Sequence, residues 1–177
     1  TFDGETIEFM TKSALHEWFK ELLGRLIPII ALEWNIPIRS GGEMTFRRRR
    51  ANRGLEPDQC YWIAREREMR GRRTYDPDAD PHPDLAVEID VAHSSVNREE
   101  VYARLRVPEL WRFNGESLRV LLLTKSGKYK EAEFSRAFPT LPVQELVPFL
   151  LPDEERDETT MLRQFIEWVR QFRPECE

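Results

Sequence analysis

The clearest hydrophobic pattern in the chain lies between residues 83 and 91, where apolar side chains occupy every second position. Side chains alternate between the two faces of a β-strand, so this spacing predicts a strand with one fully apolar face. That face is made by Leu85, Val87, Ile89 and Val91. The other face carries two acids, Glu88 and Asp90. The pattern therefore predicts a core strand that holds two carboxylates.

Glu88 and Asp90 would lie roughly 7 Å apart along this strand, at about 3.3 Å per residue. Burying a carboxylate is costly unless a positive group neutralises it, and a divalent cation would meet that need. The alternative is an edge or half-exposed strand whose acidic face meets water. The stretch alone leaves both interpretations open.

Apolar residues at helical spacing predict a long helix near the N-terminus. Ser13 can cap it, and the helix runs to about residue 33 unless Pro28 kinks it or ends it early. Its apolar stripe consists of Leu15, Phe19, Leu22, Leu26 and Ile30. Glu17 points away from that stripe and His16 lies at its flank, so the pattern alone indicates surface or structural roles for both.

A second amphipathic helix is predicted over about residues 158–172. Its apolar stripe can either pack on the body of the protein or form a contact in a homodimer. The core of a single domain spanning residues 1–177 would then cover about residues 13–149.

Turn residues divide the middle of the chain into short strands and loops. Strands are predicted at 36–38, 44–46, 59–64, 83–91, 109–113, 118–124 and 128–134. The first two flank a hairpin-like turn at 40–42, and residues 47–54 and 65–82 are predicted to be loops. With a helix over about 97–106, capped by Ser94 or Ser95, these elements predict an α/β fold.

Arg98 falls on the packed side of that helix, together with Val101, Tyr102 and Leu105. An arginine in such a position normally needs an acid as a partner. It can form an inward ion pair or contact a phosphate, or it can snorkel outward over the helix.

The distribution of charge adds a candidate binding surface. The net charge is −5, which argues against indiscriminate coating of DNA, yet ten arginines cluster between residues 47 and 73. The densest run consists of Arg47, Arg48, Arg49, Arg50 and Arg53. This run is either a phosphate-contacting face or a solvated rim.

The longest apolar run, at 26–32, is interrupted by a proline and is too short to span a bilayer. We therefore expect a cytoplasmic protein with no membrane partner.

Asp58 is the best candidate partner for Glu88 in binding a cation. Asp84 and Glu88 are separated by about 13 Å of strand, so those two acids cannot easily share one ion. Asp58 begins the predicted strand at 59–64, and two acids on adjacent strands can bind one cation together.

The stretches 54–63, 83–90 and 107–112 resemble the Uma-type bacterial putative restriction endonuclease family. The resemblance covers about residues 13–149. That family is similar to the PD-(D/E)XK nuclease superfamily, which implies an αβββαβ core with a mixed β-sheet flanked by helices.

The resemblance also implies roles for individual residues. Asp58 matches the acid of the PD element, and Glu88 matches the acid of the (D/E)XK element. Asp90 stands where the superfamily usually has a lysine, and Arg98 on the following helix matches a substitute position. Glu17 matches the supporting acid of the first helix. Asp84 is either a further metal ligand or merely the turn residue before the strand.

These correspondences predict a DNA endonuclease that depends on Mg²⁺ or Mn²⁺. Asp58, Glu88 and Asp90 would form its acidic cluster, which binds the metal, and Arg98 would contact the phosphate. Arginine stays protonated at working pH and cannot act as a general base, so activation of water would fall to the metal. The alternative is a nuclease-fold protein that binds nucleic acid or a protein partner without cutting.

Overall fold

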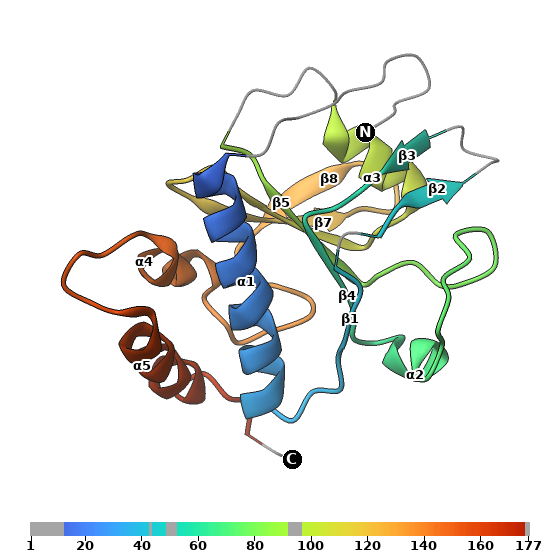
Figure 1. The fold of residues 1–177 in the computed structure, drawn as a ribbon. Coiled ribbons are helices and arrows are strands. Elements are labelled where there is room, and N and C mark those ends of the chain that lie inside the picture. Colours follow the sequence, from blue (N-terminus) through green and yellow to red (C-terminus); the bar gives the residue numbers. More distant parts are fainter. Residues whose placement is uncertain (1–12, 43, 49–52, 92–96, 176–177) are drawn as a thin grey trace.

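The computed structural model describes residues 13–42, 44–48, 53–91 and 97–175. Within them, six strands form one sheet in the order β1-β4-β5-β6-β7-β8 (Figure 1). Their bounds are β1 Arg39–Ser40, β4 Gln59–Trp62, β5 Leu85–Ile89, β6 Glu109–Phe113, β7 Leu118–Leu123 and β8 Tyr129–Ala132. Strands β5 and β6 run parallel, and the other neighbouring pairs are antiparallel. The predicted mixed sheet is confirmed.

Helices cover both faces of this sheet. On one face lie α1 (Ala14–Glu33), α4 (Val147–Leu150) and α5 (Glu158–Arg170), with the 3-10 helix η2 (Val143–Leu146) beside them. On the other face lies α3 (Arg98–Leu105). Figure 1 shows α1 running across the front of the sheet, with α4 and α5 at its side. The predicted α/β fold is confirmed.

The alternating pattern of β5 decides which core each side chain enters. Leu85, Val87 and Ile89 pack with α1, while Ala86 packs with Tyr102 of α3. Because β5 lies between β4 and β6 and is covered on both faces, all five of its residues are buried. The alternative of an edge strand with a wetted acidic face is wrong.

Helix α1 begins as predicted and continues further than its proline suggests. The Ser13 side chain accepts a hydrogen bond from the backbone N–H of His16 and caps the helix. Pro28 removes one helical hydrogen bond, but Ile27 and Ile30 beside it are fully buried, and the helix runs to Glu33. Burial of its neighbours outweighs the lost bond.

The predicted hairpin of residues 36–38 and 44–46 is wrong. Strand β1 pairs with β4, and the Gly41 N–H donates to the Cys60 carbonyl, so this segment follows β4. A side chain at Gly41 would collide with Cys60 and Trp62, which is why the chain can pass so close there.

Part of the predicted loop at 47–54 is also strand. Strands β2 (Phe46–Arg48) and β3 (Arg53–Leu55) pair in a separate two-stranded ribbon, which lies beside α3 (Figure 1). A short helix, α2 (Glu66–Met69), likewise interrupts the predicted loop at 65–82. Both features are too short for periodicity to reveal.

Helix α5 packs within the chain against α1. Its inward residues Met161, Phe165 and Val169 are buried, and Arg170 pairs with Glu33 at the end of α1. Helix α3 is capped by Asn97, while Ser94 and Ser95 lie outside the described residues. No helix in the described ranges is long and apolar enough to cross a membrane.

Candidate active site

Two carboxylates from adjacent strands meet at the centre of the sheet. Gln59 of β4 pairs with Val87 of β5, so continuing this antiparallel register by one residue sets Asp58 opposite Glu88. The Asp58 Oδ2 atom accepts a hydrogen bond of 2.9 Å from the Ile89 N–H. Asp58 and Glu88 are both buried. The structure therefore brings together the two acids expected to share a cation.

Helix α3 supplies both partners of the Glu88 carboxylate. The Tyr102 hydroxyl donates to Oε1, and an Arg98 Nη atom lies 2.9 Å from Oε2. The Arg98 contact is an ion pair without an aligned hydrogen bond. Arg98 also donates to the Glu56 carbonyl at 3.2 Å. Of the two predictions for Arg98, the inward ion pair is confirmed and the snorkelling side chain is wrong.

Burial dominates the electrostatics of Glu88. The loss of hydration raises the pKa of Glu88 to about 8, although Arg98 and the Tyr102 hydroxyl act in the opposite direction. Burial lowers the pKa of Arg98, but Glu88 together with Tyr102, Asp58 and Asp90 more than offsets this, so the pKa is raised overall. Glu88 thus has a high affinity for a proton.

Asp90, which follows β5, is held by an arginine from the next strand. Its Oδ2 atom lies 2.6 Å from Arg112 Nε, and the same guanidinium pairs with Glu99 of α3. Arg112 is the register partner of Glu88 on β6. Asp90 itself is acidic. The positive charge in this part of the site comes from Arg112 of β6 and from Arg98 of α3.

The N-terminal end of α1 joins the acid pair through His16. Its Nε2 atom lies 3.2 Å from Asp58 Oδ2, and its Nδ1 atom lies 3.3 Å from Glu17 Oε1. The other oxygen of Glu17 pairs with Lys20 at 3.2 Å. His16 and Lys20 are buried polar residues whose roles periodicity missed. Their spacing of four residues along one side of α1 was the only available signal.

Asp84 is engaged elsewhere. Its Oδ2 atom accepts hydrogen bonds from the N–H groups of Ile63 and Arg65, and its Oδ1 atom accepts from Arg65 Nε. It precedes β5 at the end remote from Glu88. This placement favours the turn-residue interpretation over the metal-ligand interpretation.

The donor set fits a hard divalent cation held by two acids. Glu88 is fully buried and its Oε2 atom has no aligned hydrogen bond, while Asp58 adds a second carboxylate beside it. Mg²⁺ prefers oxygen ligands and is often bound through one or two carboxylates and several waters. Among the described residues, no three acidic, histidine or cysteine side chains converge as a metal-binding group. The fit therefore rests on Asp58 and Glu88 alone.

Comparison with known proteins supplies the family. The model of the family Uma2, described as "Putative restriction endonuclease", matches residues 1–152. The chain belongs to the Uma2 family.

One solved structure shares the fold of this Uma2 chain, and a second aligns more weakly. A "putative nuclease belonging to DUF820" from Anabaena variabilis aligns with a TM-score of 0.53 and 12% identity, over 92% of this chain and 86% of that one. The type IIG restriction endonuclease BpuSI aligns with a TM-score of 0.45 and 8% identity, over 94% of this chain and 18% of that one. Among curated proteins, none matches.

The arginine run of the Uma2 chain is described only in part. Arg47, Arg48 and Arg53 belong to the β2–β3 ribbon by their backbone, while their side chains, and the whole of Arg49 and Arg50, lie outside the described residues. The later arginine group consists of Arg65, Arg67, Arg70, Arg72 and Arg73. Three of these five arginines have acidic partners. These pairs are Arg65 with Asp84, Arg70 with Glu66, and Arg72 with Asp80. That later group is thus largely neutralised within the chain.

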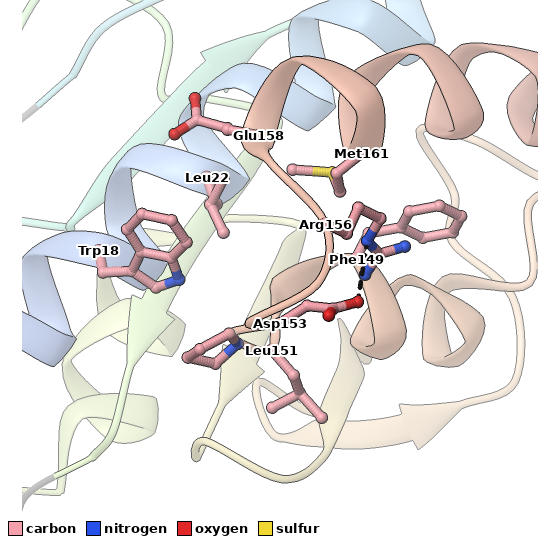
Figure 2. Close-up of a pocket in the computed structure, with 9 residues that line it drawn as sticks. Trp18, Leu22, Phe149, Leu151, Asp153, Arg156, Glu158 and Met161 are labelled. Atoms are coloured by element: carbon pink, nitrogen blue, oxygen red, sulfur yellow. Dashed lines mark ion pairs between the residues drawn. The ribbon is translucent and has the colours of Figure 1, made fainter.

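A small pocket of about 110 Å³ lies between α1 and the α4–α5 region (Figure 2). Trp18 and Leu22 line it from α1, Met161 lines it from α5, and Asp153 and Arg156 form an ion pair at its edge. It shares no residue with the acid cluster.

The raised pKa of Glu88 predicts how metal-free stability depends on pH. Because this pKa is about 8 in the folded protein and near 4.5 when unfolded, the folded state binds the proton more tightly. The contribution of Glu88 to the free energy of unfolding should therefore be highest below about pH 4.5. It should fall towards pH 8 by at most about 1.4 kcal/mol per pH unit. Urea unfolding in EDTA should show that the wild type loses stability relative to Glu88→Gln across this window. A difference in stability between the two proteins that stays constant with pH would contradict the assignment. Glu100→Gln, at an exposed position of α3, serves as the control.

Proposed function

We propose that this Uma2 chain is an endonuclease that hydrolyses DNA phosphodiester bonds with Mg²⁺ or Mn²⁺. The observation that carries the proposal is the buried pair of Asp58 and Glu88, set side by side on adjacent strands. Membership of a family described as restriction endonucleases supports DNA as the substrate. The restriction endonuclease-like fold supports a divalent metal.

Asp58 and Glu88 would hold the cation. When bound, the cation would supply a water of lowered pKa and would neutralise charge on the phosphate. Arg98 would contact the phosphate and stabilise negative charge that develops there, because its guanidinium already lies 2.9 Å from Glu88. Tyr102 would fix the orientation of Glu88 through its hydroxyl. Glu17 would act from a distance, through His16.

Two observations favour the second candidate, a nuclease-fold protein that binds nucleic acid or a protein partner without cutting. The superfamily lysine is replaced by Asp90, whose carboxylate is bound by Arg112. The described acids also do not form a group of three around one point. Both features would weaken cleavage but would leave the arginine run at 47–50 and 53 unchanged.

Cleavage of supercoiled plasmid DNA separates the two candidates. The wild type should nick the plasmid with Mn²⁺ or Mg²⁺ and should stop in EDTA, because the acid pair needs the cation. Glu88→Gln keeps the size of the side chain and the acceptor for Tyr102 but removes the charge, so nicking should fall by at least about a hundredfold. Gel analysis of initial rates measures the loss. Equal residual nicking by both proteins would identify a contaminant and support the non-cutting candidate.

We also propose that the arginines of the run at 47–50 and 53 contact phosphates, since β2 and β3 lie beside α3, which carries Arg98. If so, the logarithm of the DNA affinity should fall steeply with the logarithm of the salt concentration, because bound phosphates release counterions. Replacing Arg47 and Arg48 by Ala should flatten that slope by about one unit per lost contact, measured by fluorescence anisotropy. Slopes equal to the wild type would make the run a solvated rim.

A further inference from the structure

His16 links helix α1 directly to Asp58 of the acid pair and also contacts Glu17 on its own helix. Its Nε2 atom lies 3.2 Å from Asp58 and its Nδ1 atom lies 3.3 Å from Glu17. The side chains of His16 and Asp58 are each 6% exposed, so their contact is buried, whereas Glu17 is 43% exposed. One imidazole thus spans two carboxylates that belong to different elements of the fold.

The two ring nitrogens of His16 contact different carboxylates. Each ring nitrogen faces a carboxylate oxygen, and a carboxylate is only an acceptor. The Nε2 atom lies 3.2 Å from the Oδ2 atom of Asp58, which also accepts a hydrogen bond of 2.9 Å from the Ile89 N–H. These two contacts reach the same oxygen from α1 and from β5. They restrict the rotation of the carboxylate beside Glu88.

The position of the imidazole is itself fixed by the start of the helix. The His16 N–H donates to the Ser13 hydroxyl at 3.1 Å, so the residue belongs to the capped first turn. On the other side of the ring, Glu17 is held by Lys20 at 3.2 Å. The backbone of His16 is therefore held by Ser13, and its ring lies between Glu17, which Lys20 contacts, and Asp58.

From this geometry we infer that His16 is a positioning residue, which holds Asp58 through Nε2 in the orientation that completes a divalent-cation site with Glu88. The inference deepens the proposed function and rests on it. Residues that orient metal ligands typically change metal affinity by roughly ten- to a hundredfold when they are lost. His16 itself is not a ligand in this assignment.

Two substitutions separate the two ring nitrogens. His16→Gln places an amide nitrogen near the position of Nε2 and keeps a donor for Asp58. His16→Asn places its amide nitrogen near the position of Nδ1, which keeps the contact with Glu17 and loses Asp58. Mn²⁺ affinity, measured by electron paramagnetic resonance of free Mn²⁺, should stay close to wild type in His16→Gln. In His16→Asn it should weaken roughly ten- to a hundredfold.

Thermal unfolding without metal, together with the variant His82→Gln, distinguishes positioning from general stability. His82 is a second buried histidine, so its variant reports the cost of losing a buried imidazole. Mn²⁺ affinity that is unchanged in both His16 variants, or that falls equally in both, would overturn the inference. Affinity losses that merely follow the loss of thermal stability, as in His82→Gln, would also overturn it. Wild-type protein without saturable Mn²⁺ binding would overturn the metal-dependent function and this inference with it.

Discussion

Full burial of the Glu88 carboxylate is the constraint on which the rest of the site depends. The residue lies on a strand with neighbours on both sides and helices on both faces, and it is inaccessible to solvent. A carboxylate in such a place must keep a proton or meet a positive group. Burial raises the pKa of Glu88 to about 8, which shows that Arg98 offsets only part of the cost. A proton can offset the remainder, and in the proposed function a divalent cation does so.

Helices on both faces of the sheet bring groups to this carboxylate or to its neighbour Asp58. Helix α3 contributes Arg98 and Tyr102, and α1 contributes His16 to Asp58. A second set of charges, Asp90 with Arg112 and Glu99, joins β5, β6 and α3 at the flank. Helix α3 is thus tied to the sheet by two ion pairs of opposite polarity, from adjacent residues. This arrangement fixes the start of α3, and with it Arg98.

Sequence periodicity predicted the elements whose apolar residues alternate along a strand or follow one side of a helix. It found β5 and its faces, the long first helix, the inward Arg98 and the final amphipathic helix. It missed the β2–β3 ribbon and the pairing of β1 with β4, because two- and three-residue strands have no readable period. His16 was missed for a different reason. Its contact with Asp58 joins residues far apart in the chain, and no local pattern encodes such a contact.

The central claim is that Arg98, a proton and a divalent cation are alternative partners for one buried charge, and Arg98→Ala tests it most directly. Without Arg98 the pKa of Glu88 should rise further, so the loss of thermal stability in EDTA should be larger at about pH 9 than at about pH 6. Mn²⁺ at about pH 9 should recover part of that loss, whereas Arg104→Ala on the same helix should behave like the wild type. An equal loss at both pH values, with no extra stabilisation by Mn²⁺, would contradict the account.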